Sequence, residues 1–216
     1  QDIHRIDWID RVGELGALLL EARLIKERQP VHNRKLRQNL ELCTWQLVEH
    51  ATGDYRPHLV LGDEFDLGAG QDCFGLFASK REATLALRKI AEAHQLCQAV
   101  LGLEKTRAPG RACFAYQLQQ CKGACVGKEA VGLHSARLMS ALAKLKLKAW
   151  PFPGAVGIVE TDEVTGRRDI HVISGWRYLG TVHDAADIAG LLEAEHRIAF
   201  DRDTYQVLVK HLAGRP

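Results

Sequence analysis

The sequence predicts an α+β fold for this chain of 216 residues. Apolar residues recur at helical spacing through residues 15–25 and predict a helix that ends before Pro30. Two strand-like runs, residues 42–48 and 58–61, flank a turn-forming Thr-Gly-Asp sequence and predict a β-hairpin. Because 46% of the residues are hydrophobic, the chain can bury a core, and its composition excludes a disordered or fibrous protein.

The other elements follow in order along the chain. Residues 3–9 are a short strand candidate ahead of the first helix. Ser79 is placed to cap a helix that runs to about His94, because serine oxygens accept hydrogen bonds from first-turn amides. A further helix is expected over residues 130–147. Strands over residues 155–160, 169–174 and 176–182, and helices over residues 184–195 and 201–212, complete the pattern.

Three segments are predicted, with boundaries near residues 40 and 150. A Pro-Phe-Pro-Gly run just after residue 150 is the best linker candidate. Residues 41–149 hold the hairpin, the helices and a cysteine-rich, loop-rich stretch, and residues 150–216 form a small α+β region. Residues 1–40 hold the first helix.

Basic residues are concentrated in the first two thirds of the chain, although the net charge is only +2. Residues 21–37 hold six Lys or Arg against two acids, and residues 105–128 hold five against none. This distribution is typical of a surface that meets an anionic backbone, although charge alone fits an ordinary solvated surface equally well. The candidate DNA contacts are Arg23, Lys26, Arg34, Lys35, Arg37, Arg111 and Lys122.

Neither a membrane span nor a secretory signal is visible in the sequence. No apolar run approaches the roughly 18 residues that a spanning helix needs. Six cysteines without a secretory signal indicate reduced thiols or metal ligands rather than disulfides. The sequence therefore predicts a cytoplasmic protein that does not associate with membranes.

Four of the cysteines, Cys97, Cys113, Cys121 and Cys125, are separated by 15, 7 and 3 residues. They could be buried thiols that act as small apolar residues. They could bind zinc, although only the last pair has the close spacing of a zinc knuckle. They could also hold an iron–sulfur cluster, which accepts thiolates from more widely spaced loops. The remaining two, Cys43 in a strand and Cys73 in a loop, are interpreted as ordinary residues.

Glu21 fits its surroundings least well, because its helical neighbours at three and four residues are Ala17, Leu18, Leu24 and Ile25. A carboxylate beside an apolar stripe is costly unless it is paired or bound to a cation. It could simply reach water at a partly exposed helix end. Alternatively, it could coordinate Mg²⁺ or Mn²⁺, which prefer oxygen ligands and borrow others from substrate phosphate.

Residues 17–26, ALLLEARLIK, followed by QPVHN at residues 29–33, resemble the last helix of the GIY-YIG nuclease domain in the UvrC/Cho excinuclease family. The resemblance places the family's metal-binding glutamate on Glu21 and a late active-site asparagine on Asn33. The family's two tyrosines and catalytic arginine would lie upstream. Residues 1–40 are therefore expected to be the C-terminal part of a truncated GIY-YIG α/β nuclease domain.

The cysteine-rich stretch resembles the same family. Residues 111–126, RACFAYQLQQCKGACV, are similar to its pattern R-x-C-L-x-Y-Q-[IL]-x-x-C-x-x-P-C-V, with Ala124 in place of the usual proline. The spacer after Cys97 is longer than in common members, so this ligand matches least well. The resemblance implies a [4Fe-4S] cluster on the four cysteines, with zinc as the alternative.

The resemblance implies a metal-dependent DNA endonuclease of nucleotide excision repair, with this chain alone inactive. Residues 150–216 lack the features of the long UvrC proteins, which points to the short Cho-like branch that cuts on the 3′ side of a lesion. That tail is also similar to fusions with an exonuclease like the polymerase III epsilon subunit. Expected partners are damaged duplex DNA and other excision repair proteins. The alternative is a non-catalytic iron–sulfur or zinc module that binds DNA or docks onto a partner.

Overall fold

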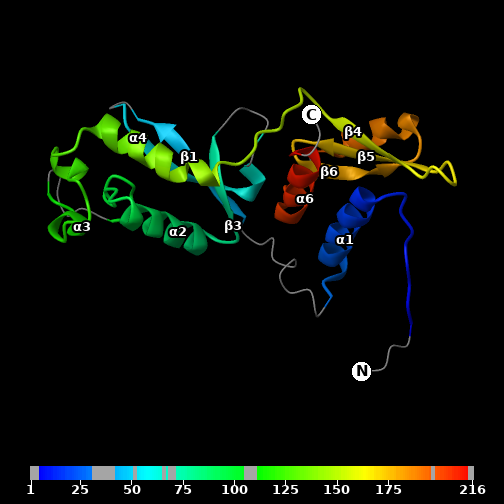
Figure 1. Ribbon diagram of the computed structural model, residues 1–216, viewed down its shortest axis with the longest axis horizontal. Helices are drawn as coiled ribbons and strands as arrows, with labels where there is room; N and C mark the ends of the chain where they lie inside the picture. Colours follow the sequence, from blue (N-terminus) through cyan, green and yellow to red (C-terminus); the bar gives the residue numbers. More distant parts are fainter. Residues whose placement is uncertain are drawn as a thin grey trace. The chain divides into compact units, whose positions relative to one another are not determined.

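The computed structural model describes residues 5–30, 42–50, 53–64, 67, 72–104, 111–195 and 198–213 (Figure 1). The chain divides into two compact units. The middle unit is Leu40–Ala149, and the terminal unit joins Gln1–Asn39 to Trp150–Pro216. Both units combine helices with an antiparallel sheet, which confirms the predicted α+β class. The terminal unit thus joins the first and third of the predicted segments.

The middle unit consists of a three-stranded sheet with helices packed on it. Its strands have the order β2-β1-β3. The hairpin pairs Cys43 with Leu61 at one end and Glu49 with Tyr55 at the other, as the sequence predicts. The elements are β1 (Cys43–Glu49), β2 (Tyr55–Leu61), the 3-10 turn η2 (Gly62–Glu64), β3 (Cys73–Phe77), α2 (Lys80–Ala93), α3 (Phe114–Gln117), η3 (Ala124–Val126), α4 (Val131–Leu142) and η4 (Ala143–Leu145).

Helix α2 begins at the predicted cap. The Ser79 hydroxyl accepts a hydrogen bond from the backbone amide of Glu82 at 3.2 Å. In return, the Glu82 carboxylate accepts one from the amide of Ala78 at 2.9 Å, which gives two donors near the helix start a partner. The face that carries Ala83 and Leu87 is fully buried against the sheet. The cap and the apolar spacing together fix where this helix starts and which face it buries.

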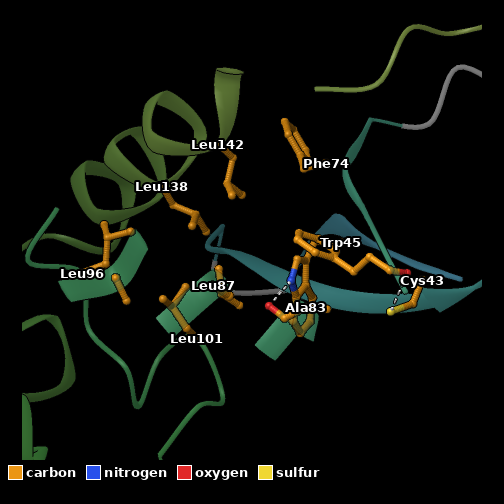
Figure 2. Close-up of a cluster of buried hydrophobic side chains, with 11 residues drawn as sticks. Cys43, Trp45, Phe74, Ala83, Leu87, Leu96, Leu101, Leu138 and Leu142 are labelled. Atoms are coloured by element: carbon orange, nitrogen blue, oxygen red, sulfur yellow. Dashed lines mark hydrogen bonds between the residues drawn. The ribbon is translucent and has the colours of Figure 1, made fainter. Parts of the chain in front are cut away.

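The core of the middle unit lies between the sheet and helices α2 and α4. Figure 2 shows Leu138 and Leu142 pointing from α4 toward the side chains that α2 and β1 contribute. At the centre, the Trp45 indole donates a hydrogen bond to the carbonyl of Ala83 at 3.1 Å. This bond satisfies the one polar atom of a large buried side chain, which the apolar core could not otherwise accommodate.

Replacing Leu138 with alanine should lower the free energy of unfolding of the middle unit by about 2–5 kcal/mol, because the side chain is fully buried and leaves a cavity. Urea or thermal unfolding followed by circular dichroism measures the effect. The matched control is Leu133→Ala on the same helix, where the side chain is 58% exposed and the change should stay within about 0.5 kcal/mol. Equal effects at both positions would contradict this core.

The terminal unit pairs a second three-stranded sheet, in the order β4-β5-β6, with helices α1 and α6, which lie side by side. An aromatic cluster supports the unit: the Trp176 ring contacts Trp150 and Tyr205, with centroids 5.1 and 5.2 Å away. The elements are α1 (Glu14–Arg28), β4 (Val156–Thr161), β5 (Arg168–Ser174), β6 (Arg177–Val182), η5 (Ala185–Asp187), α5 (Ile188–Glu193) and α6 (Arg202–Ala213).

The strand predicted at residues 3–9 is wrong where the structure describes it. Residues 5–9 have no regular structure, and Ile6, Trp8 and Ile9 are 72%, 84% and 54% exposed. A strand needs a neighbour to pair with, and within the described chain no strand pairs with this segment. None of the helices described here has the length and apolar composition that a membrane crossing requires.

Candidate metal centre

Four cysteine side chains of the middle unit meet at one point. All four Sγ atoms lie within 4.8 Å of one another, and those of Cys97 and Cys113 are 3.9 Å apart. Cys97 follows α2, Cys113 is the N-cap of α3, and Cys125 lies in η3. The structure thus brings together the cysteines that their spacing singles out. In the described part of the chain, no other group of three or more potential His, Cys, Asp or Glu ligands converges in this way.

Backbone amides point at three of the sulfurs. The amide of Cys113 donates to Cys125 Sγ at 3.4 Å, that of Tyr116 to Cys113 Sγ at 3.3 Å, and that of Gly123 to Cys121 Sγ at 3.3 Å. Hydrogen bonds to sulfur favour the thiolate, which is the form that binds metal. The loops are therefore folded so that their own amides stabilise a set of anionic ligands.

Gly123 allows the loop to close between two of the cysteines. Its φ is +85°, in the left-handed region that favours glycine. A Cβ at this position would lie 2.7 Å from the Tyr116 ring and 2.8 Å from Lys128 Cβ, distances that side chains do not tolerate. The Lys-Gly-Ala-Cys sequence is therefore the local reason that Cys121 and Cys125 reach the same point.

Burial and mutual hydrogen bonding shift the pKa values of Cys97, Cys113 and Cys125 in different directions. Burial raises the pKa of Cys97 well above its ordinary value, and it raises the pKa of Cys113 to about 11. Burial also acts to raise the pKa of Cys125, but hydrogen bonds from the Cys113 amide and from neighbouring thiols outweigh it and lower that pKa. Cys125 thus ionises more readily than Cys97 or Cys113, and a bound cation would supply the charge that stabilises the thiolates of those two residues.

The four thiols have the chemistry to ligate either of two metal groups, and their separations match one of the two. A single tetrahedral ion with metal–sulfur bonds of about 2.3 Å holds its four sulfurs about 3.8 Å apart. The 3.9 Å between Cys97 and Cys113 matches that arrangement. An iron–sulfur cubane has an iron at each of four corners, so the same sulfurs would have to lie farther apart. Four thiolates are the required ligands in both cases.

Helix α4 supports the centre through residues that the sequence did not single out. The His134 ring is fully buried, and its Nε2 accepts a hydrogen bond from the amide of Cys97 at 3.0 Å. Burial lowers the pKa of His134, which keeps the ring neutral and able to accept. One turn on, Arg137 forms two hydrogen bonds with Glu129, at 2.8 and 2.9 Å, and another with the carbonyl of His94. The sequence gives no signal for these contacts, because the partners lie 37 and 43 residues away in the chain.

Two family models match most of the chain, including the segment that holds the four cysteines. The family model described as "UvrC/Cho excinuclease, middle domain" matches residues 42–144, and the one described as "Excinuclease Cho C-terminal domain" matches residues 155–216. The protein named "Excinuclease cho" from Escherichia coli O6:H1 is 44% identical over 209 residues, which cover 96% of this chain and 67% of that protein. The chain belongs to the UvrC/Cho excinuclease family.

Two further relatives carry names from the same family. "Excinuclease cho" of Salmonella typhi is 40% identical over 209 residues, covering 96% of this chain and 68% of that protein. "UvrABC system protein C" of Mycoplasma pneumoniae is 33% identical over 127 residues, covering 57% of this chain and 20% of that protein. No solved structure matches the chain. The four-cysteine site lies within the segment that the UvrC/Cho middle-domain model covers.

The other two cysteines lie in the sheet of the middle unit, away from this group of ligands. Cys43 is in β1 and Cys73 is in β3, and both are buried. The prediction that Cys73 lies in a loop is wrong, because its segment pairs with β1 opposite Gln46. Burial raises the pKa of Cys73, as expected for a thiol that packs as a small apolar residue.

Glu21 lies on an exposed face of α1 next to the buried stripe, so its carboxylate reaches water, which is the first of the two alternatives that the sequence left open. The buried face of α1 runs through Leu15, Leu19 and Ala22, and the neighbouring Leu18 is 39% exposed. The sequence could not show this, because apolar residues lie on several sides of the helix and the terminal unit decides which side is covered. Glu21 instead lines a cleft of about 620 Å³ between α1 and α6.

Two of the residues predicted to contact DNA form ion pairs with acidic side chains of the chain itself. Arg23 pairs with Glu27 one turn along α1, at 2.6 Å on the exposed surface. Lys26 forms ion pairs with two aspartates at the start of α6 and is largely covered there. Arg111 and Lys122 are exposed beside the cysteine site. Asn33, Arg34, Lys35 and Arg37 lie outside the described residues.

Proposed function

We propose that the full-length protein is a metal-dependent endonuclease of nucleotide excision repair that incises damaged DNA on the 3′ side of the lesion. Identity of 44% with an excinuclease over 96% of the chain is the observation that carries the proposal. The ALLLE-x-x-L-I-K resemblance supports Glu21 as the metal ligand and Asn33 as a further active-site residue. A position in the cytoplasm is part of the same proposal.

The proposal is tested with an end-labelled duplex that carries one defined lesion. The full-length protein with Mg²⁺ should produce a single nick on the 3′ side of the lesion. By the same proposal, the 216-residue chain alone should show no Mg²⁺-dependent nicking, because the resemblance places the other active-site groups outside it. Nicking on the 5′ side only, or none by the full-length protein, would contradict the assignment.

For the metal centre we propose a [4Fe-4S] cluster on Cys97, Cys113, Cys121 and Cys125. The separations of 15, 7 and 3 residues support it, because zinc sites use closer pairs. The resemblance to the family pattern favours the same cluster. Zinc is the second candidate, since the sulfur separations suit one ion. In either case, the bound metal would hold together a loop-rich region that shares little of the main core.

The middle unit should bind DNA without sequence preference and with strong salt dependence. The described residues 111–128 contain Arg111, Lys122 and Lys128, all exposed, and no acid. If about four phosphates are contacted, the affinity should fall about a hundredfold between 50 and 200 mM salt. Fluorescence anisotropy with duplexes of unrelated sequence measures this dependence. Changing Arg111 and Lys122 together to glutamine should reduce the slope by about two, and a flat salt profile would contradict the electrostatic interpretation.

A second candidate is a non-catalytic metal-bearing module that binds DNA or docks onto other excision repair proteins. It is favoured by the position of the cysteine site in the middle unit, whereas Glu21 belongs to the terminal unit. Incision by the full-length protein with an intact cysteine site but with Glu21 substituted distinguishes the two. Under this second candidate, incision is carried out by the excision repair proteins that the module docks onto, and substituting Glu21 would leave it unchanged.

A further inference from the structure

Helix α1 begins without a cap from its own segment. Its N-cap residue is Gly13, whose extended backbone offers no side-chain acceptor. The first amides of a helix have no partner inside the helix, and the positive end of its dipole favours an anion. Here the anion comes from β4: the Glu160 carboxylate accepts a hydrogen bond from the amide of Leu15 at 3.0 Å and one from Gly16 at 2.8 Å.

Glu160 is itself fixed by a chain of hydrogen bonds through the sheet. Its Oε2 lies 2.9 Å from Nε2 of His171, a fully buried residue of β5. The other ring nitrogen lies 2.8 Å from the Thr181 hydroxyl, which in turn lies 2.5 Å from the Tyr178 hydroxyl. Burial acts to raise the pKa of Glu160, but the Gly16 amide, the His171 ring and the Leu15 amide outweigh it and lower that pKa. The carboxylate is therefore charged and held from both sides.

Two glycines let the helix come this close to the sheet. A Cβ on Gly16 would lie 2.7 Å from the His171 ring, and one on Gly13 would lie 2.3 Å from the Glu160 carboxylate. Glycine within a helix is intrinsically unfavourable, so its place at Gly16 needs a reason. Close approach of the helix to the Glu160–His171 pair supplies that reason.

The other end of α1 is held by α6. The Lys26 ammonium forms an ion pair with Asp201 and lies 3.6 Å from Asp203. Burial acts to raise the pKa of Asp201, but Lys26 and Thr204 outweigh it and lower that pKa, whereas burial and the charge of Asp201 raise the pKa of Asp203. Asp201 is thus the principal partner. Because these two carboxylates already pair with the Lys26 ammonium, Lys26 links α1 to α6 and is not free to bind a DNA phosphate.

Between these two anchors, Glu21 is left exposed. The cleft of about 620 Å³ is lined by Glu21 and Glu160 together with Gln206 and Lys210 of α6. Rotation of an α-helix by one residue turns a side chain through about 100°, so the direction of Glu21 depends on how α1 is seated. The anchors fix both the rotation of α1 and its position along its axis.

We propose that Glu160 and His171 are positioning residues. They hold α1 against the C-terminal sheet and thereby orient the Glu21 side chain. The inference rests on the proposed function of Glu21 as the ligand of the catalytic metal. It gives the Cho C-terminal domain a role in the nuclease site: it supplies the surface against which the metal-bearing helix is set. Residues that orient metal ligands commonly change metal affinity about 10–100-fold when replaced.

The test is single-turnover nicking of a lesion duplex by the full-length protein, measured across Mn²⁺ concentrations, with DNA affinity measured separately. Glu160→Gln replaces one of the two accepting carboxylate oxygens with an amide donor and removes the negative charge. It should raise the half-saturating Mn²⁺ concentration about tenfold or more and leave DNA affinity unchanged. The matched control is Glu163→Gln, an exposed residue of the loop that follows β4, which should match the wild type. A merely structural defect would lower the fraction of active protein without shifting the half-saturating concentration.

A second pair of variants tests the close approach. Gly16→Ala should reproduce the Mn²⁺ shift, whereas Gly190→Ala in α5, where a Cβ would meet nothing within 4 Å, should not. If Glu160→Gln does not fold, Glu160→Asp keeps the charge, shortens the reach, and serves for the same measurement.

The outcomes separate the two proposals. If Glu21→Gln abolishes nicking while both Glu160→Gln and Gly16→Ala leave the Mn²⁺ dependence unchanged, the positioning role is overturned and the proposed function stands. If Glu21→Gln cuts at the normal rate, the proposed function is overturned and the positioning role with it. Loss of nicking with Glu21→Gln and a Mn²⁺ shift with Glu160→Gln and Gly16→Ala would support both.

Discussion

Replacing Cys121 with serine should release the bound metal and destabilise the middle unit by several kcal/mol. Cys121 is buried, its sulfur accepts the amide of Gly123, and it lies within 4.8 Å of the other three ligands. Structural four-ligand sites in small domains bind zinc with about 10–16 kcal/mol, which is comparable to the whole stability of a domain. Loss of one ligand therefore removes a contribution that the loops around α3 cannot replace from their own small core.

Metal content and hydrogen exchange measure this effect. Anaerobically purified wild type should be brown and carry about four irons per chain under the cluster proposal. Cys121→Ser should carry none, and amides of the segment from Ser79 to Leu147 should exchange faster. Cys43→Ser is the matched control, because Cys43 is equally buried but lies in β1 away from the site; it should keep its metal. One zinc and no iron in the wild type would overturn the proposal of an iron–sulfur cluster, whereas the four cysteines would still be a metal site.

The same site should lose metal as the pH falls. Every cysteine ligand must be deprotonated to bind, so protons compete with the metal. Burial raises the pKa of Cys113 to about 11, which makes the competition stronger than for an ordinary thiol. Metal affinity is thus expected to decrease steadily with acidification, and a chelator titration at several pH values measures it.

The sequence predicts those parts of the fold whose signals are local. The start of α2 follows from Ser79, and the hairpin follows from strand-like runs around a turn. The four cysteines could be predicted to share one site because the spacing of cysteines along a sequence indicates metal binding. Each of these inferences needs only residues that are close in sequence or identical in type.

Features that depend on distant partners could not be predicted from the sequence. The buried side of α1 is chosen by the terminal unit, so Glu21 is exposed although its neighbours are apolar. Its N-terminal cap comes from Glu160, which lies 144 residues from Gly16. The same holds for His134, whose ring accepts a hydrogen bond from the Cys97 amide, 37 residues away. No periodicity or composition signals such pairs; they follow only once the chain is folded.

Glu21→Gln in the full-length protein should reduce incision by about a thousandfold or more, with DNA binding nearly intact. Glutamine keeps the size and hydrogen bonding of glutamate but lacks the anion that a divalent cation requires. Because Glu21 is exposed on α1, the substitution should change the free energy of unfolding by no more than about 0.5 kcal/mol. The loss of activity would then be chemical rather than structural, and circular dichroism melting of the same preparation establishes this.

The matched control for Glu21 is Glu14→Gln, because Glu14 is also exposed on α1 and lines the same cleft. Its variant should cut at close to the normal rate, which separates a specific ligand from the general negative charge of the cleft. Asn33→Ala should reduce activity less than Glu21→Gln, since an amide positions a group but supplies no charge. A Glu21→Gln protein that nicks damaged DNA at a near-normal rate would leave the metal without its proposed ligand. The catalytic assignment of α1 would then be lost, whereas the membership in the family and the cysteine site would stand.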